Sequence, residues 1–418
     1  MALSRRPLSL LLTGLLAATG LCTTLDAHAA DGIRIVESVP TGTIYGEPGM
    51  PRAREVWLEM LHNAKKSVDI AAFYIAEKKG EALSGVLDAL EERSSAGVQV
   101  RLLVEPSFLH DTQPVLDRFK AFPNIHIEIL PTDRLTGGIL HAKYMIVDRD
   151  VTFIGSQNWD WRALDHNHEL GAEITDARFA ESMEGAFEEL WALGGGKLLA
   201  KEQYLTAAPP AVPPTTESDP ISFEQDGAKV LAFPAFSPPS MLPRWYTAEQ
   251  PALENLIHQA RHDLRIQVMT LSAIRQYGPP GYWPEIDTAI RDAAARGVDV
   301  KIIVADWALH QPMQAYLKSL AVLPHITVKF STVPMAKEGF IPYARVEHAK
   351  YAIADDDAFM IGTGNWEWSY FNNTVDASLF VHGTKLTGTM LSIFDRDWNG
   401  PYVTTLSPAT QYQPAHNH

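Results

Sequence analysis

The chain has 418 residues, of which 46% are hydrophobic and 20% charged, and its formal net charge is -15 at pH 7. The hydrophobic fraction excludes an intrinsically disordered protein, and the length predicts two or three domains with a large core. The acidic balance argues against a protein that coats duplex nucleic acid or an anionic membrane by its overall charge. It leaves room for a small basic active site.

The first 29 residues have the pattern of a secretory signal peptide. Arg5 and Arg6 form a short positive region, residues 8–21 are almost wholly apolar, and an Ala-His-Ala sequence ends at Ala29. The apolar run is short for a membrane span, which needs about 20 residues. We therefore expect cleavage after Ala29, export to the periplasm or the medium by either the general or the twin-arginine route, and no stable transmembrane segment in the mature chain.

The only cysteine of the chain, Cys22, lies within this segment. A mature protein without cysteine has no disulfide, no thiolate nucleophile and no thiolate metal ligand. A core of this size needs no disulfide to be stable.

The remaining chain repeats itself. The helical pattern ending at residue 66 and the apolar run 68–75 recur as residues 258–262 and the run 264–271, and the strand after Gly97 recurs after Gly297. Offsets of 196 and then 200 residues indicate a duplicated domain with unequal loops. Helical patterns alternate with continuous apolar strands, which predicts an α/β fold with sheets covered on both faces. Both glycines are expected in left-handed turns that end a helix.

These patterns predict the domain boundaries. We expect a signal peptide at residues 1–29, a first domain at 30–206, a proline-rich linker at 207–222, a second domain at 223–405 and a flexible tail at 406–418. The two halves are expected to pack about a pseudo-two-fold axis.

A third repeated segment carries the reactive side chains, at an offset of 207 residues. Its members in the two halves are His141 and His348, Lys143 and Lys350, Asp148 and Asp355, Asn158 and Asn365, and, eleven residues further on, Glu169 and Asp376. In a strand, side chains two residues apart share a face, so the histidine and lysine of each half project together. Two halves placed face to face would surround one cavity with two imidazoles, two ammonium groups and two carboxamides.

This set of groups fits the cleavage of a phosphodiester. One neutral imidazole can attack phosphorus and form a phosphohistidine, while the other, protonated, gives its proton to the leaving oxygen and then activates water. The lysines and asparagines can stabilise charge on the phosphoryl oxygens, and Glu169 and Asp376 can each orient an imidazole. We expect no metal and no cofactor.

Other residues near the motifs allow two interpretations. Asp148 and Asp355 are expected to be structural, satisfying backbone donors at strand ends. Trp159 and Trp366 are candidates for stacking on bases, with packing in the core as the alternative. His166 and His168 suggest a metal site, but no neighbouring ligands in the sequence complete one.

The two motifs resemble those of the phospholipase D superfamily, which has His-x-Lys, an aspartate and a Gly-Ser-x-Asn run. Residues 140–171, 341–346 and 395–398 are similar to the lysosomal phospholipase D-like 5′ exonucleases and the related poxviral envelope proteins. The similarity extends from Ile33 to Tyr402. It implies two pseudo-symmetric phospholipase D-like α/β/α sandwich domains that share one active site and form a phosphohistidine without metal. By analogy with most of the superfamily, His141 is the nucleophile and His348 the acid.

The resemblance also implies a substrate. The leading hypothesis is an exported exonuclease that degrades single-stranded DNA or RNA from the 5′ end. The alternative is a phospholipase D or phosphatidyl transferase acting on phospholipid, and a third is a binding protein that kept the fold. Unlike the animal proteins, the mature chain is expected to lack cysteines and a membrane anchor, which argues against a lysosomal setting. A monomer is sufficient for activity, because one chain contains both motifs.

Overall fold

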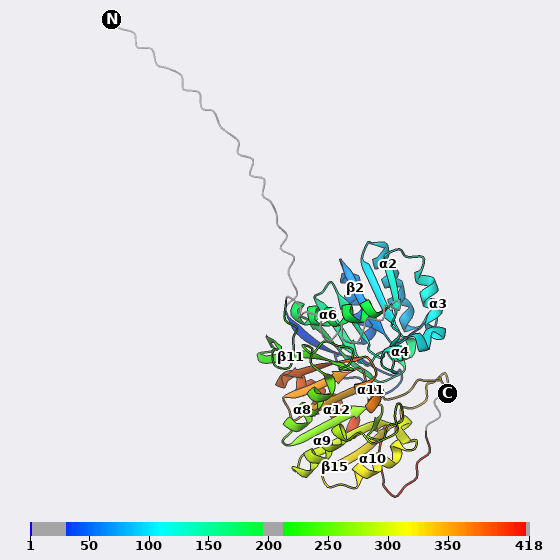
Figure 1. The fold of residues 1–418 in the computed structure, drawn as a ribbon, viewed down its shortest axis with the longest axis vertical. Coiled ribbons are helices and arrows are strands. Elements are labelled where there is room, and N and C mark those ends of the chain that lie inside the picture. The colour runs from blue at the N-terminus through cyan, green and yellow to red at the C-terminus, as the bar shows by residue number, and fades with distance from the viewer. Residues whose placement is uncertain (2–30, 195–211, 415–418) are drawn as a thin grey trace. The chain divides into compact units, whose positions relative to one another are not determined.

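Two mixed β-sheets, one in each half of the chain, form the framework of the structure (Figure 1). The computed structural model describes Met1 and residues 31–194 and 212–414. The expected signal peptide, the first part of the expected linker and the last four residues therefore lie outside the described residues. The residues from Asp31 onward form one unit rather than two separate bodies.

The first half builds a seven-stranded sheet in the order β1-β9-β7-β6-β2-β4-β5. Its elements are β1 (Gly32–Ser38), α1 (Ala53–Asn63), β2 (Ser67–Ala72), β3 (Ile75–Ala76), α2 (Ala82–Ser95), β4 (Gln99–Val104), the 3-10 turn η1 (Pro106–Phe108), α3 (Leu109–Phe119), β5 (Ile125–Ile129), α4 (Thr132–Leu135), β6 (Tyr144–Val147), β7 (Val151–Gly155), β8 (Trp159–Asp160), α5 (Trp161–Asp165), β9 (Glu169–Thr175) and α6 (Ala177–Leu193).

The second half repeats this order in a nine-stranded sheet, β10-β11-β19-β17-β16-β12-β14-β15-β20. Its elements are β10 (Ile221–Gln225), β11 (Ala228–Ser237), α8 (Glu249–Gln259), β12 (Asp263–Val268), β13 (Leu271–Ser272), α9 (Pro284–Ala295), β14 (Asp299–Ala305), the 3-10 turn η3 (Asp306–Leu309), α10 (Met313–Ala321), β15 (Ile326–Ser331), β16 (Lys350–Ala354), β17 (Ala358–Gly362), β18 (Trp366–Glu367), α11 (Trp368–Asn372), β19 (Asp376–His382), α12 (Thr384–Asn399) and β20 (Val403–Thr405). Only β10 and β20, at the two edges, have no counterpart in the first sheet.

The two sheets have the same pairing pattern. Strands β2, β4 and β5 are parallel, as are β12, β14 and β15, and the strands that carry the motifs are antiparallel hairpins. The first parallel crossover of each half, from β2 to β4 and from β12 to β14, is made by a helix followed by a glycine in the left-handed region, Gly97 with φ 98° and Gly297 with φ 89°. These turns confirm the prediction, since only glycine takes this conformation without a steric cost.

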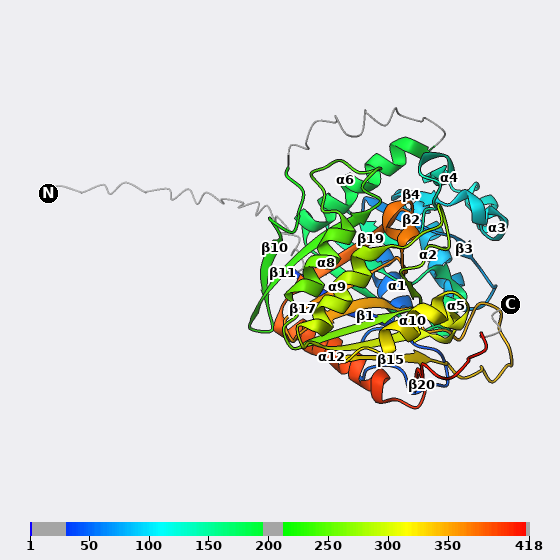
Figure 2. The same cartoon turned by 60° about the horizontal axis from the view of Figure 1, so that its bottom comes forward.

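Each sheet is covered by helices because its apolar residues face both ways. Helices α1 and α2 pack on one face of the first sheet, and α8 and α9 lie side by side on the corresponding face of the second (Figure 2). The opposite faces of the two sheets turn toward each other, with α6 and α12 beside them. Each half is thus an α/β/α sandwich, and the predicted fold class is confirmed.

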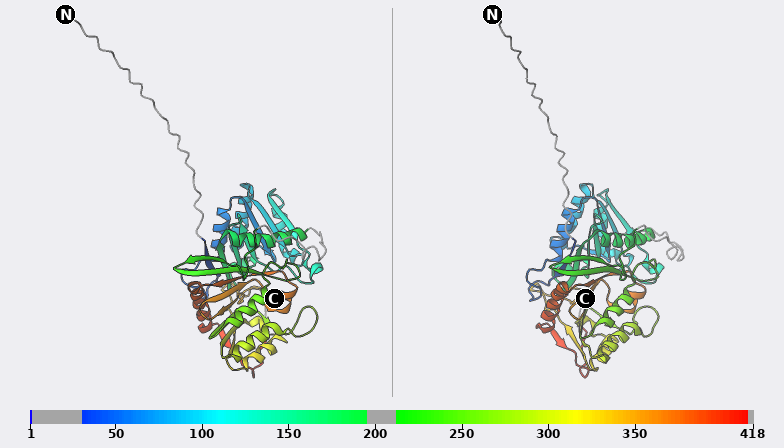
Figure 3. Two further views of the ribbon diagram at one scale, coloured as in Figure 1. Left: turned by 60° about the vertical axis from the view of Figure 1, so that its left-hand side comes forward. Right: turned by 90° about the vertical axis from the view of Figure 1, so that its left-hand side faces the viewer.

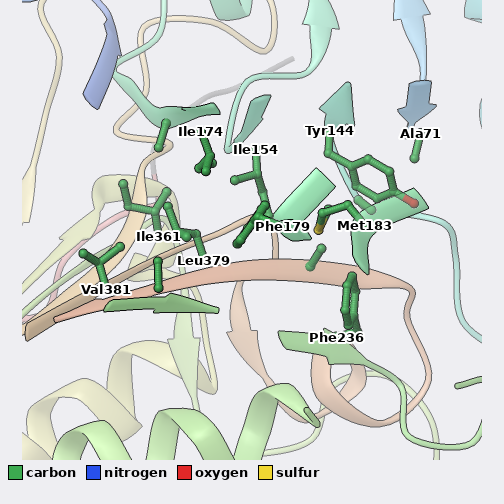
Figure 4. Packing of buried hydrophobic residues seen from close by; sticks show 14 of the residues in the cluster. Ala71, Tyr144, Ile154, Ile174, Phe179, Met183, Phe236, Ile361, Leu379 and Val381 are labelled. Carbon is green, nitrogen blue, oxygen red and sulfur yellow. The ribbon is translucent and has the colours of Figure 1, made fainter. Parts of the chain in front are cut away.

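One apolar cluster joins the two halves. Ile154 and Ile174 of the first sheet and Ile361, Leu379 and Val381 of the second belong to the same buried core (Figure 4). Strands β10 and β11 cross the border between the halves in the views of Figure 3, and β11 also contacts α6. Because this core is shared, the relative position of the two halves is fixed by apolar packing.

Two of the predicted boundaries are wrong within the described residues. The linker expected up to residue 222 already forms a strand at Ile221. The tail expected to be flexible from residue 406 is packed: Leu406 is buried, and Tyr412 lies against Phe330 at 5.1 Å between ring centroids. Apolar side chains that cover the edge of the second core explain this order. Within residues 31–194 and 212–414, no helix combines the length and apolarity that a bilayer span requires.

Candidate active site

The segments that carry the two motifs lie side by side at the interface between the two halves. Leu140 forms an isolated parallel bridge with Val375, and His168 forms the equivalent bridge with Glu347. The first bridge includes a bond from the backbone N–H of His141 to Val375 O of 2.9 Å, and the second a bond from His348 N–H to His168 O of 2.8 Å. Each histidine is therefore placed beside the first residue of a strand from the other half.

The two histidines bind carboxylates in a crossed arrangement. His141 Nδ1 lies 2.9 Å from Asp376 Oδ1, and His348 Nδ1 lies 2.6 Å from Glu169 Oε2. Each pair joins residues of different halves, and Asp376 also accepts a bond of 2.6 Å from the hydroxyl of Thr363. The sequence predicted that these carboxylates orient the imidazoles, but it did not predict which carboxylate serves which ring. With Nδ1 occupied, Nε2 is the ring nitrogen left for a substrate.

The two lysines lie beside the histidines. Lys350 Nζ donates to the backbone oxygen of His348 at 2.6 Å, and Lys143 makes the equivalent bond to His141. His141 and Lys143 precede strand β6 rather than lie in it, but the extended backbone still places them together. Both lysine side chains are buried, with 1% and 0% of Lys143 and Lys350 exposed.

The two asparagines bond to tyrosines that are not equivalent in the repeat. Asn158 Nδ2 lies 3.4 Å from the hydroxyl of Tyr74, which follows β2, and Asn365 Nδ2 lies 3.1 Å from that of Tyr370 on α11. The amide oxygen of each asparagine has no partner. For Asn365, a half-turn of the amide would let Tyr370 donate to the amide oxygen and leave two N–H donors for a phosphoryl oxygen. Tyr74 already donates its hydroxyl proton to Asp160 at 2.8 Å, so Asn158 keeps one N–H toward Tyr74 and has the other for a phosphoryl oxygen.

The charged groups of the site are strongly perturbed by burial. Burial raises the pKa of the Glu169 carboxyl to about 8 and lowers that of the Lys350 ammonium to about 7. Burial and the two lysines lower the pKa of His141 and of His348 well below the usual value for histidine. A bound anion beside these rings and ammonium groups would favour their charged forms, so the site is suited to a phosphate group.

The third members of the motifs, Asp148 and Asp355, accept backbone N–H groups at strand ends. Asp148 accepts the backbone N–H groups of residues 65, 66 and 67 at 2.7–2.9 Å, and Asp355 accepts those of residues 261, 262 and 263 at 2.8–3.2 Å. Each carboxylate thus ties a motif hairpin to the start of the neighbouring strand.

The tryptophans proposed to stack on bases are in the core instead. Trp159 and Trp366 are each 1% exposed, and Trp159 stacks on Trp57 with ring centroids 4.7 Å apart. The physical reason is the alternation of an extended chain: a residue directly after a site asparagine points away from the site.

The aromatic rings near the site come from other segments. Phe73 lies 4.9 Å and Tyr370 5.0 Å from the ring of His141, measured between centroids. The ring of Phe108 lies 4.5 Å from that of Phe73, and the ring of the exposed His110 lies 6.2 Å from that of Phe108, again between centroids. Sequence reasoning missed this row, because its members follow two different strands and share no motif.

Sequence reasoning also missed the partners of His168. Among the described residues, His168, Glu347 and Asp397 form a group whose potential metal-binding atoms lie within 4.8 Å of one another. However, Nδ1 of His168 is 2.7 Å from Glu347 and Nε2 is 2.9 Å from Glu37, so neither ring nitrogen has a free lone pair for a metal. Arg396 provides a further cation, bonded to Glu37 at 2.7 Å. The group is therefore an ion-pair network.

Comparison with known proteins agrees with this geometry. A family model described as "Cardiolipin synthase, PLD-like domain" matches the chain twice, over residues 57–191 and 253–398, and each match contains one complete motif. The Xenopus laevis 5'-3' exonuclease PLD3 is 32% identical over 414 residues, which cover 91% of this chain and 82% of that protein. Human PLD3, with the same description, is 32% identical over 400 residues, covering 88% and 79%. Mouse 5'-3' exonuclease PLD4 is 29% identical over 415 residues, covering 89% and 79%.

Solved structures share the fold at low sequence identity. The phosphatidylserine synthase of Haemophilus influenzae superposes with a TM-score of 0.58 at 14% identity, over 84% of this chain and 85% of that one. The polyphosphate kinase of Porphyromonas gingivalis has a TM-score of 0.54 at 13% identity, over 89% of this chain and 48% of that one.

Proposed function

The chain belongs to the phospholipase D superfamily and is a phosphodiesterase of the hydrolase class, and from this premise we propose that it removes nucleotides from the 5′ end of single-stranded nucleic acid. The observation that carries the chemistry is the crossed pair of imidazoles. Each is held at Nδ1 by a carboxylate of the other half, and each has a buried lysine at its side.

The proposed reaction has two steps through a phosphohistidine. His141 Nε2 attacks phosphorus, the bond from phosphorus to the leaving oxygen breaks, and His348 Nε2–H gives its proton to that oxygen. His348, now neutral, takes a proton from water as the water oxygen attacks phosphorus, and the N–P bond breaks to restore His141. Lys143, Lys350 and the two asparagines stabilise the charge on the non-bridging oxygens in both steps.

Two observations favour nucleic acid as the substrate. Relatives that match most of this chain are named 5'-3' exonucleases. In addition, the rings of Phe73 and Phe108 extend from His141 toward the exposed His110. Successive aromatic rings of this kind stack on the bases of a single strand and do so without regard to sequence.

A phospholipid substrate is the second candidate. The segment between β15 and β16, which leads to His348, exposes apolar side chains: Met335 at 68%, Phe340 at 52% and Tyr343 at 53%. An exposed apolar group beside an active site can contact acyl chains. The reacting group would be a phosphodiester in both cases. The wording of the matching family model, cardiolipin synthase, is consistent with this candidate.

We also propose that the enzyme is exported and active as a monomer. Export is supported by the signal-peptide pattern of residues 1–29. The monomer is supported by the crossed pairs, which assemble a complete site within one chain.

The deciding experiment uses residues 30–418, excess EDTA and a single-stranded oligonucleotide with a free 5′ hydroxyl. Stepwise loss of nucleotides from the 5′ end is expected, and both His141→Ala and His348→Ala should abolish it. Parallel reactions with phosphatidylglycerol and phosphatidylcholine vesicles measure headgroup release. Headgroup release without loss of nucleotides would replace the exonuclease by the lipid enzyme, and inactivity of the wild type on every diester would refute the proposed function as a whole.

A further inference from the structure

The pseudo-two-fold axis relates two bridges that differ in charge. Leu140 and Val375 form an apolar bridge next to His141, and Glu347 and His168 form a charged bridge next to His348. In the repeat, Glu347 occupies the position of Leu140, and His168 that of Val375, both at the offset of 207 residues that relates His141 to His348. Both bridges share the backbone bond from the motif histidine, but the next N–H differs: that of Ala142 donates to Val375 O at 2.8 Å, whereas that of Ala349 donates to the Glu347 carboxylate at 3.2 Å.

The His168 side chain of the charged bridge has a partner at each ring nitrogen and on one face of its ring. His168 is fully buried between Glu347 and Glu37, and it donates from both ring nitrogens, which requires a protonated ring. Burial opposes this charge, but Glu347 and Asp397 raise the pKa of His168 to about 10. The ring of Tyr45 stacks on it with centroids 4.4 Å apart and an angle of 16°. The carboxylate of Glu347 is therefore held in place by the ring of His168.

Glu347 adjoins His348 in the chain and raises its pKa, whereas the residue in the same place beside His141 is Leu140. Burial, Lys350 and Lys143 lower the pKa of His348, whereas Glu347 and Asp160 raise it. Burial, Lys143, Lys350 and His348 lower the pKa of His141, and the residue at its side, Leu140, has no charge. The carboxylates that face the two Nδ1 atoms, Glu169 and Asp376, are equivalent in the repeat and do not distinguish the rings.

We propose that the Glu347–His168 bridge breaks the symmetry of the site by keeping the proton on His348, which makes His348 the acid and leaves His141 as the nucleophile. Glu347 and His168 are positioning residues, since both act through His348. The inference rests on the proposed two-step mechanism: the proton that Glu347 stabilises is the one that passes from His348 Nε2 to the leaving oxygen. A diester whose leaving group needs no proton should not depend on the bridge.

The test compares two leaving groups in Glu347→Gln, which keeps the size of the side chain and removes its charge. The substrates are a thymidine dinucleotide, whose alkoxide must be protonated, and thymidine p-nitrophenyl phosphate, whose phenolate leaves unaided. We expect kcat for the dinucleotide to fall about 10- to 100-fold and kcat for the p-nitrophenyl ester to change less than about 3-fold. His348→Ala should show the same selectivity in stronger form.

A second readout is the pH profile. In Glu347→Gln the high-pH limb of kcat/KM for the dinucleotide should move to lower pH, because a negative charge near His348 is lost while Lys143, Lys350, Asp160 and Glu169 remain. Leu140→Val, at the equivalent position of the apolar bridge, is the matched control and should leave both the limb and the leaving-group ratio unchanged.

The outcomes separate the inference from the proposed function. Suppose that the wild type is active and that Glu347→Gln lowers kcat equally for both substrates, or for neither. This result would overturn the role of the bridge but would not contradict the proposed phosphodiesterase activity. If Glu347→Gln does not fold, His168→Gln serves instead. It removes the positive charge that opposes the Glu347 carboxylate, so the high-pH limb of kcat/KM for the dinucleotide should move to higher pH, opposite to the shift expected in Glu347→Gln. An unchanged limb in a folded His168→Gln would count against the bridge.

Discussion

The surroundings of the two catalytic histidines differ more than the histidines themselves. His141 has the aromatic rings of Phe73 and Tyr370 within about 5 Å and an apolar bridge at its side, whereas His348 has a network of buried charges. Both rings nevertheless have the same Nδ1 contact to a carboxylate. In the proposed two-step reaction, the groups that are needed twice are duplicated, and the side chains around them differ where the two steps would need different protonation.

A second contrast between the halves is the hydrogen bond that holds each motif asparagine, which a different tyrosine provides in each half. Tyr74 and Thr270 are equivalent in the repeat and bond to the equivalent acids Asp160 and Glu367 at 2.8 and 2.7 Å. Tyr74 also reaches Asn158, but a threonine hydroxyl is too short for the same task. In the second half, Tyr370 from α11 provides the bond to the asparagine instead.

The largest expected difference between the halves is in the covalent intermediate. His141→Ala removes the proposed nucleophile and should lower kcat by about 10,000-fold or more on every diester. His348→Ala should instead allow a covalent thymidylyl-histidine to accumulate with the p-nitrophenyl ester. A quench in alkaline denaturant, in which the acid-labile N–P bond survives, and mass spectrometry of the labelled peptide measure this. A thymidylyl group on the peptide of His348 in the wild type would reverse the two roles.

The crossed carboxylates should give a crossed phenotype. Asp376→Asn disturbs the tautomer of His141, so it should lower kcat about 100- to 10,000-fold with both leaving groups. Glu169→Gln acts on His348 and should affect mainly the dinucleotide. Steady-state kinetics with the two substrates measures this, and the reverse assignment would mean that each carboxylate serves its own half.

The charged bridge should make stability depend on pH, and the apolar bridge should not. Because the pKa of His168 is raised to about 10, its contribution is complete below the pKa of a free histidine and is lost as the pH rises toward 10. The difference in unfolding free energy between the wild type and His168→Gln should shrink by a few kcal/mol between pH 7 and pH 10. Val375→Ala is the control and should cost the same at both pH values. Lys350 titrates in this range with the opposite sign, so only the difference between variants is informative.

The two motif aspartates should behave alike. Asp148→Ala and Asp355→Ala each remove an acceptor of three backbone N–H groups, most of which can bond to water, so each should cost about 2 kcal/mol of stability. Chemical denaturation measures this loss, and kcat at 20 °C should stay within about 2-fold of the wild type. A large loss of kcat in a stable variant would give these residues a catalytic role.

The smallest expected effect concerns the aromatic row that Phe73 and Phe108 form beside His141. Phe108→Ala removes a stacking surface and should raise KM for a single-stranded oligonucleotide about 5- to 30-fold. It should leave KM for thymidine p-nitrophenyl phosphate within about 2-fold, because that substrate has only one base. An equal effect on both would assign Phe108 to packing around His141.

The reactive residues could be predicted from the sequence because their spacing is local. His141 and Lys143 share a face of an extended segment, and Asp148 lies at the turn of a hairpin, so short-range geometry determines their positions. The same rule decides between the two interpretations of Trp159: it adjoins Asn158 in the sequence, but neighbours in an extended chain point to opposite sides, so its ring lies in the core.

The crossed pairs and the charged bridge depend on long-range packing. Glu37 and Glu347 are 131 and 179 residues away from His168, and only the shared apolar core brings the three together. One signal was present: a glutamate precedes the second His-x-Lys motif where a leucine precedes the first. The role of this glutamate could not be predicted from the sequence, because its partner His168 belongs to the other half.

The crossed pairing also has a consequence for how such a site can arise. Two identical subunits, each the size of one half, would build the same two imidazole–carboxylate pairs about an axis of exact symmetry. In such a dimer every substitution occurs twice, so a glutamate beside one histidine would stand beside the other as well. In a single chain the two halves can be substituted independently. Leu140 and Glu347 are equivalent positions at which the two halves of this protein carry different residues.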